Sequence, residues 1–251
     1  MISIKLENVT FIRNNRKIID NVSLEFPPGK TSVIIGPSGC GKSTLLKITA
    51  GLIPPTSGKV YVDGVNLLTM NRTELLDFRK KSGFVFQDAA LWANKSVYEN
   101  MILPLQVHFP GMDTDEKDKK IRSMLKAVGY TDSLLLRPAQ LSNGERKMVS
   151  LARALVISPV LLYMDTPLTL VDPSVSAKME RLILDLHSSD NTIISNFTDP
   201  SLTKRISDFA AVMKDGRVIS TGTIAEITDN KNSETRDTVS AVLYHQNSNS
   251  V

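Results

Sequence analysis

The chain has 251 residues, of which 41% are hydrophobic and 22% charged, so it carries enough apolar surface for a large buried core and is not expected to be disordered. Its formal net charge of +4 is mildly basic, and because its lysines and arginines are spread along the sequence we expect no nucleic-acid partner. The single cysteine, Cys40, excludes an internal disulfide, and no apolar run is long enough for a secretory signal or a membrane span.

The first part of the chain favours β structure. Residues 3–12 and 18–26 roughly alternate apolar and polar side chains on either side of a turn at 14–16, which predicts two strands. The largely apolar run 31–35 predicts a third strand, and the residues after Ser43 predict a helix.

Between this third strand and the helix lies a glycine-rich loop with the pattern G-x-x-x-x-G-K-[ST], which predicts a P-loop. Glycines allow successive backbone N–H groups to turn around phosphate oxygens, and the helix that follows points its positive end at the same anion. Lys42 is expected to contact the β- and γ-phosphates of ATP, and the Ser43 hydroxyl is expected to ligate Mg²⁺. The predicted nucleotide-binding residues of this loop are Gly36, Ser38, Gly39, Cys40, Gly41, Lys42, Ser43 and Thr44.

A change of pattern follows the P-loop helix. Residues 71–74 resemble a capping box that opens a helix over 75–81, and a strand-like run at 83–86 ends at Gln87, a polar residue expected to face the site. From about residue 88 to 155 the β signal disappears and helical spacing takes over, which predicts a helical subdomain.

The second half of the chain returns to alternating strands and helices. Residues 160–164 form a continuous apolar run, as a buried parallel strand does, and carry Asp165 at their carboxyl end. A helix is predicted over 173–187, and a hairpin is predicted around 215–216. The tail from residue 229 is mostly polar, and we expect it to be disordered or to dock on a partner.

The order and spacing of five landmarks resemble the ATP-binding subunits of ABC transporters. The landmarks are the P-loop at 36–44, Gln87, the sequence Leu-Ser-Asn-Gly-Glu at 141–145, Asp165, and Val-Asp at 171–172. The resemblance covers about residues 3–228. It implies an α/β fold with a P-loop NTPase core, a β-rich N-terminal part and a helical subdomain inserted at about 88–155, in one nucleotide-binding domain over 1–228. Residues 86–92, with Asn100 and Pro104, further resemble the ATPases of Mla/Mce-type phospholipid transporters.

The resemblance also implies a role for each landmark. Gln87 and Asp165 match the family's catalytic and Mg²⁺-binding positions, together with Ser43. Ser142, Asn143, Gly144 and Glu145 match the signature sequence, which acts on the nucleotide of a second subunit. The position that stacks on adenine falls near Arg13, whose guanidinium can stack on a purine; the alternative is a solvated turn arginine.

Two landmarks depart from the family pattern. The glutamate that should follow Asp165 is Thr166, and the histidine expected after the strand near 192 is Thr198. The three histidines, His108, His187 and His245, lie in other segments. A hydroxyl is a poor proton acceptor at neutral pH, and a positioned base contributes about 10²- to 10⁴-fold to a rate, so hydrolysis at this site is predicted to be weak. The alternative is hydrolysis by another route.

The partners expected from the resemblance are integral-membrane permease subunits and a second ATPase subunit. A heterodimer with an intact ATPase is favoured over a homodimer, and the expected location is the cytoplasmic face of the inner membrane. A groove around Gln87, Leu91, Trp92 and Val97 is predicted to receive a cytoplasmic helix of the permease. The alternatives are a soluble, non-transport ATPase of the same class and an inactive structural partner.

Overall fold

Two β-sheets organise the structure, a computed structural model that describes residues 1–169, 171–189 and 191–244. The first sheet is antiparallel, and its strand order is β2-β1-β4-β5. It contains β1 (Ile4–Arg13), β2 (Arg16–Phe26), β4 (Ser57–Val62) and β5 (Val65–Asn66). The predicted strands at 3–12 and 18–26 are therefore present, with the turn between them.

The second sheet has the order β10-β9-β3-β8-β7-β6 and places the chemically important turns together. Its strands are β3 (Thr31–Ile35), β6 (Ser82–Val85), β7 (Leu161–Met164), β8 (Thr192–Ser195), β9 (Phe209–Lys214) and β10 (Arg217–Gly222). All neighbours except the β9–β10 hairpin are parallel. Because the carboxyl ends of parallel strands share one edge, the segments that follow β3, β6, β7 and β8 meet there.

Helices cover this second sheet and extend from it. They are α1 (Lys42–Thr49), α2 (Arg72–Lys81), α3 (Val97–His108), α4 (Thr114–Ala127), α5 (Asn143–Leu155), α6 (Pro173–His187), α7 (Pro200–Ile206), α8 (Ile224–Thr228) and α9 (Ser233–Leu243), with short 3-10 turns η1 (Leu67–Thr69) and η2 (Pro138–Gln140). The predicted capping box opens α2, where Asn71 accepts from the backbone of Glu74 and the Glu74 carboxylate accepts from the backbone of Asn71.

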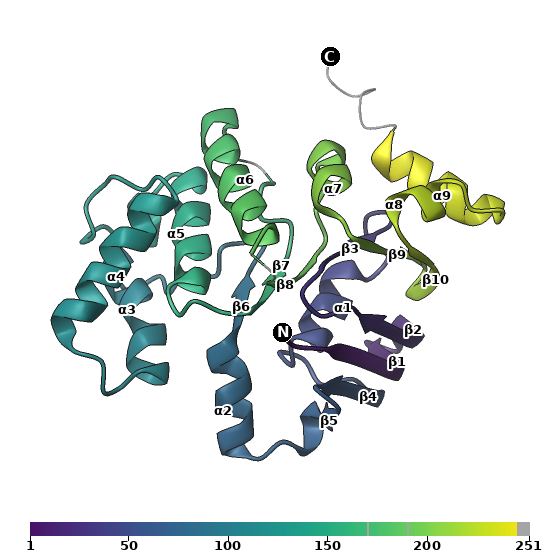
Figure 1. Ribbon diagram of the computed structural model, residues 1–251, viewed down its shortest axis with the longest axis horizontal. Coiled ribbons are helices and arrows are strands. Elements are labelled where there is room, and N and C mark those ends of the chain that lie inside the picture. Colours follow the sequence, from purple (N-terminus) through teal and green to yellow (C-terminus); the bar gives the residue numbers. More distant parts are fainter. Residues whose placement is uncertain (170, 190, 245–251) are drawn as a thin grey trace.

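The helices α3, α4 and α5 form a group at one end of the molecule, opposite the antiparallel sheet (Figure 1). Each turns an apolar face inward, including Leu105 of α3, Leu125 of α4 and Leu151 of α5, and these side chains belong to one continuous core with strands β3, β6 and β7. The helical region predicted between residues 88 and 155 therefore consists of these three helices, packed on the edge of the parallel sheet.

The C-terminal tail and Val97 differ from what the sequence suggested. Residues 233–243 form α9, which buries Val239 and Leu243 against the chain's own β9 and α7. The spacing of these two residues gives the helix an apolar face, although the segment is polar on average. The last residues of the predicted tail, 245–251, lie outside the described part.

Val97 is 1% exposed, because the first turn of α3 points it into the core, so it cannot line an open groove.

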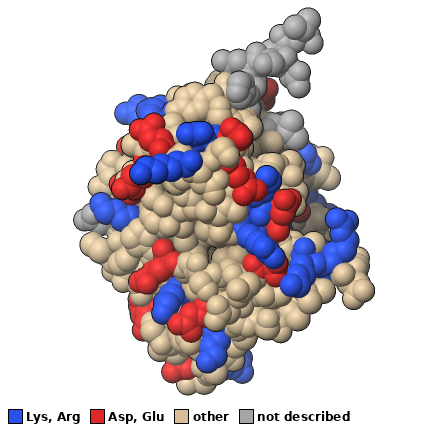
Figure 2. All heavy atoms as spheres, turned by 90° about the vertical axis from the view of Figure 1, so that its right-hand side faces the viewer, with Lys and Arg blue, Asp and Glu red and all other residues tan. Residues whose placement is uncertain are grey.

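Charges of both signs are intermixed on the face that carries the antiparallel sheet and the last helices (Figure 2). Ion pairs explain part of the pattern: Asp20 binds Lys17 and Arg217, and Lys214 binds Glu234. Within residues 1–169, 171–189 and 191–244, no helix is long and apolar enough to cross a bilayer.

Candidate nucleotide-binding site

The P-loop connects the carboxyl end of β3 to α1 in the strand–loop–helix arrangement that the motif requires. Gly39 and Gly41 have φ values of 80° and 106°, in the left-handed region where a side chain would be strained. A Cβ on Gly36 would lie 2.2 Å from the carbonyl oxygen of Met213, so the backbone of the neighbouring strand excludes any larger residue. The loop glycines are therefore demanded by backbone conformation and by space.

The Lys42 ammonium is folded back over the loop. Its Nζ donates to the carbonyl oxygens of Gly36, at 2.7 Å, and Pro37, at 2.8 Å. Cys40 is buried, and its Sγ lies 4.0 Å from Lys42 Nζ. Burial raises the pKa of the Cys40 thiol, although the neighbouring Lys42 charge acts in the opposite direction. The loop thus holds one cation at the place where phosphate oxygens are expected.

A pocket of about 550 Å³ opens above this loop. This volume is within the ordinary range of about 300–1,000 Å³ for small-molecule sites. The loop supplies one wall, and Gln87, Thr166 and Thr198 contribute from other turns at the same sheet edge. The full set of lining residues from the P-loop is Gly36, Pro37, Ser38, Gly39, Gly41, Lys42, Ser43 and Thr44.

Ser43 and Asp165 form the centre that fits a divalent cation. The Ser43 hydroxyl donates to Asp165 Oδ1 at 2.7 Å, and Asp165 is fully buried at the end of β7. Asp165 Oδ2 is buried and has no hydrogen-bond partner among the described residues, and Lys47 Nζ lies 4.0 Å from it. A carboxylate and a hydroxyl beside a phosphate site are oxygen ligands of the kind that Mg²⁺ prefers, so the residues fit this ion.

Asn196 connects these groups and was missed by the sequence analysis. It follows β8, next to β7 in the sheet, and its Nδ2 donates to Asp165 Oδ1 at 2.8 Å and to Ser43 Oγ at 3.3 Å. Its Oδ1 accepts from the backbone N–H of Thr166 at 2.8 Å. A polar residue directly after a buried strand was the available signal. Its importance depends on β8 lying beside β7.

Thr166 and Thr198, which were predicted to stand in place of a glutamate and a histidine, both line the pocket. Thr166 is 8% exposed, its φ is 43°, and its Oγ1 has no hydrogen-bond partner in the described structure. A β-branched residue at positive φ is strained. Thr198 Oγ1 lies 3.3 Å from Thr169 Oγ1. Among the described residues that line the pocket, none is a histidine or a carboxylate.

Arg13 lies outside the pocket. It ends β1, pairs with Arg16 across the hairpin, and is exposed, whereas Ile18 lines the pocket on that side. Its stacking on adenine stays a prediction. Two of the three histidines are also elsewhere: His187 Nδ1 lies 2.9 Å from the Thr31 hydroxyl, and His108 ends α3, while His245 is outside the described residues.

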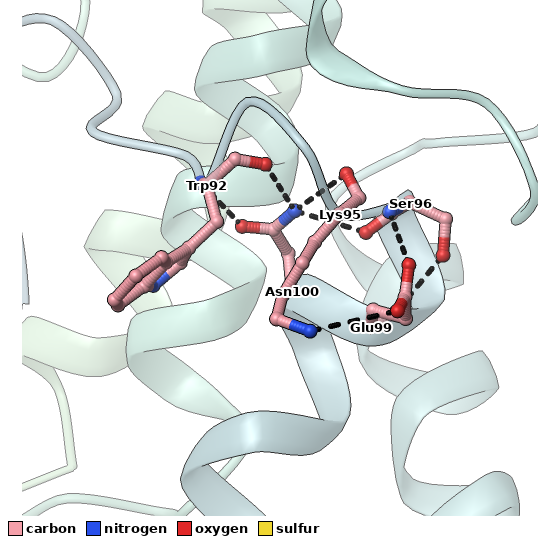
Figure 3. Close-up of polar contacts among 5 residues, drawn as sticks. All are labelled: Trp92, Lys95, Ser96, Glu99 and Asn100. Carbon is pink, nitrogen blue, oxygen red and sulfur yellow. Dashed lines mark hydrogen bonds and ion pairs between the residues drawn. The ribbon is translucent and has the colours of Figure 1, made fainter.

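Gln87 joins the pocket to a tightly bonded loop. Its side chain lines the pocket, and the loop that follows is held by Asn100 (Figure 3). Asn100 Oδ1 accepts from the backbone of Trp92 at 2.8 Å, and its Nδ2 donates to the carbonyls of Trp92, Lys95 and Ser96 at 2.9–3.3 Å. The Trp92 side chain itself is 55% exposed.

Comparison with known proteins identifies the family. The family model described as "ABC transporter" matches residues 19–169. The chain belongs to the ABC transporter family. The chain is 34% identical over 229 residues to the methionine import ATP-binding protein MetN of Carboxydothermus hydrogenoformans, covering 90% of this chain and 67% of MetN. It is also 34% identical over 231 residues to the intermembrane phospholipid transport system ATP-binding protein MlaF of Haemophilus influenzae, covering 89% of this chain and 85% of MlaF.

A solved structure agrees with this assignment. The dimeric bacterial ABC transporter cassette MJ0796 superposes with a TM-score of 0.80 at 32% identity, covering 88% of this chain and 98% of that one. The predicted fold class, an α/β P-loop core of the ABC ATPase type, is therefore confirmed. The family implies nucleotide binding, and the pocket above the P-loop is the candidate site for it.

The segment that resembles the signature, residues 141–145, lies at the start of α5, and none of its residues is in the described lining of the pocket. Ser142 caps the helix: its Oγ accepts from the backbone of Glu145 at 3.2 Å, and the Glu145 carboxylate accepts from the backbone of Ser142 at 2.6 Å. Hydrogen bonds from Asp132 and Ser142 lower the pKa of Glu145. A Cβ on Gly144 would meet Val175 at an ordinary 3.5 Å. Packing within the chain therefore does not require glycine there.

Proposed function

We propose that this cassette binds ATP·Mg²⁺ through Lys42, Ser43 and Asp165 and drives a membrane permease, with weak hydrolysis at its own site. The observation that carries the proposal is the pocket itself: it joins a complete P-loop to the Ser43–Asp165 pair, yet its described lining contains no general base. Binding energy is therefore retained while the proton-transfer contribution, about 10²- to 10⁴-fold, is missing.

The test is nucleotide titration of the isolated chain with Lys42→Ala and a matched control, Lys126→Ala, on the exposed last turn of α4. Lys42→Ala removes the ammonium that faces the phosphates, so binding of ATP·Mg²⁺ should be lost, while Lys126→Ala should bind as the wild type does. Equal affinity in both variants would place the nucleotide elsewhere.

The proposed permease site is a groove of about 510 Å³ between α3 and the edge of the parallel sheet. Its lining includes Phe84, Phe86, Trp92, Leu103 and Val107. Trp92 and Val107 are more than half exposed, and an exposed apolar patch of this kind marks an interface. Of the four residues predicted to frame the groove, only Trp92 belongs to this lining. Gln87 lines the nucleotide pocket, whereas Leu91 and Val97 pack toward the core, and outward-facing residues of α3 take their place. Docking there would place the chain on the cytoplasmic face of the membrane.

Phospholipid is the substrate class that we propose. The support is how much of each relative's length the match covers. The chain is 34% identical to both MlaF and MetN over the matched regions, but the match covers 85% of MlaF and only 67% of MetN. Co-purification of the permease and assay of the reconstituted complex with phospholipid vesicles, against methionine as the competing substrate, would distinguish the two.

The proposed assembly is a heterodimer in which an intact ATPase subunit complements this one. The signature residues Ser142 and Gly144 are retained at the start of α5, where Ser142 is exposed and Gly144 is buried, whereas the hydrolytic pair is replaced by Thr166 and Thr198. The solved cassette MJ0796 is dimeric, which supports a paired arrangement. In such a pair, the signature of this chain completes the partner's site.

A further inference from the structure

Lys147 is a buried lysine that the nucleotide site does not use directly. It lies in α5, is 3% exposed, and forms no ion pair with any residue in the described part of the chain. Its Nζ donates to the main-chain carbonyl oxygen of Gln87 and, at 3.5 Å, to that of Thr166. Burying an ammonium is costly unless its donors are satisfied, so these two carbonyls hold the charge in place.

The three segments that meet at Lys147 have different functions. Gln87 follows β6 and lines the nucleotide pocket, whereas its neighbours Phe86 and Ala90 line the groove. Thr166 follows Asp165 in a strained turn beside the Mg²⁺ centre. The same helix that carries Lys147 begins with the signature.

A second cation on α5, the half-buried Arg153, fixes the groove side of this loop. Arg153 donates to the carbonyl oxygens of Ala89, at 3.1 Å, and Ala90, at 2.9 Å. Both alanines have positive φ, 64° and 43°, so the loop needs external support to keep this conformation. Arg153 has no hydrogen bond to the Thr166 turn among the described residues. Lys147 is the one cation of the described structure that bonds to both turns.

We propose that Lys147 is a positioning residue that ties the Thr166 turn to the Gln87 loop, so that a shift of the turn on ATP·Mg²⁺ binding reaches Trp92 beside the groove. The inference rests on the proposed nucleotide binding. The physical reason is that moving either turn away from the ammonium would take one of its two carbonyl acceptors from a buried charge, which is costly. The two turns therefore move together.

The chain contains its own reporter for this coupling. Trp92 is the only tryptophan, is 55% exposed, and lies on the loop that Lys147 and Asn100 hold. We expect ATP·Mg²⁺ to change its emission in the wild type. Lys147→Met should abolish that change in emission, while Lys147→Arg restores it. The control, Lys126→Met, should respond as the wild type does.

The variants separate positioning by hydrogen bonding from mere filling of space. Lys147→Met fills a similar volume but cannot donate to either carbonyl, whereas Lys147→Arg keeps a charged donor there.

The outcomes are distinguishable because nucleotide binding is followed separately with a fluorescent ATP analogue. A wild-type response in a folded Lys147→Met variant that binds ATP overturns the inference, and so does a Lys147→Arg response as weak as that of Lys147→Met. If Lys147→Met does not fold, Lys147→Gln, which is neutral, is judged by the same criterion. Failure of the wild type to bind the analogue would refute the proposed function, and this inference with it.

Discussion

Replacing Asn196 by alanine should destabilise the protein strongly, although Asn196 is only one small side chain. It is 1% exposed and makes three hydrogen bonds, to Asp165, Ser43 and the backbone of Thr166. A buried hydrogen bond is worth about 1 kcal/mol, and a buried group left without a partner costs about 1–3 kcal/mol. Because the Thr166 N–H loses its acceptor, we expect the free energy of unfolding to fall by about 2–4 kcal/mol.

Urea unfolding measures this change. With a slope of about 2 kcal/mol per molar, the midpoint should move down by about 1–2 M. The matched control is Asn94→Ala on the exposed loop surface, where a change within about 0.5 kcal/mol is expected. Equal midpoints for Asn196→Ala and Asn94→Ala would refute the assignment of Asn196 as the centre of a buried network.

Asn196→Asp tests the electrostatic part of the same reasoning. It keeps the volume and the acceptor for Thr166, but it places a second carboxylate beside Asp165, which raises the pKa of one of the pair. A carboxyl group whose pKa is higher in the folded than in the unfolded protein stabilises the fold increasingly as pH falls through the folded pKa. The free energy of unfolding of Asn196→Asp, relative to that of the wild type, should therefore rise as the solution is acidified. A difference in this free energy that does not depend on pH would contradict the reasoning.

Three further outcomes are expected. Trp92→Ala should weaken co-purification of a permease and leave ATP binding intact, since the side chain is more than half exposed; loss of folding would instead assign it to the core. Burial, with Lys80 and Arg79 nearby, lowers the pKa of His108. The free energy of unfolding should therefore rise with pH in the range just below the ordinary histidine pKa, and His108→Gln should remove this pH dependence. Thr166→Glu combined with Thr198→His should raise ATP hydrolysis by up to about 10²- to 10⁴-fold, and an unchanged rate would show that the missing pair is not what limits turnover.

The local part of the site could be predicted from the sequence because its geometry is set by neighbouring residues. The P-loop needs a strand, glycines that turn the backbone, and a helix, all within about 20 residues. Its lysine and serine therefore lie where the pattern places them. The capping box of Asn71 and Glu74 was predictable for the same reason, since both partners lie in one helical turn.

The rest of the site depends on which strands become neighbours, and periodicity does not encode that order. Asn196 matters because β8 lies beside β7, and Lys147 matters because α5 brings it to the turns that follow β6 and β7. Val97 was misplaced because its apolar side chain fits a groove or a core equally well. The docking of α9 on its own chain was not predicted, since a few apolar residues suffice to dock a helix whose average composition is polar.

The last prediction concerns the partner of this cassette. If the signature of this chain completes the competent site of an intact ATPase, then Ser142→Arg should abolish turnover by the assembled transporter, because a bulky cation at an exposed helix start would block the approach of the second subunit. The mutation should leave ATP binding by the isolated chain unchanged, since Ser142 is not among the described lining of its own pocket. Loss of the capping hydrogen bond could weaken α5 itself, so Ser142→Ala, which removes the cap without the bulk, serves as the control. Hydrolysis that survives Ser142→Arg in an assembled complex would refute the role in trans, and a purified complex containing two copies of this chain and no other ATPase would refute the heterodimer.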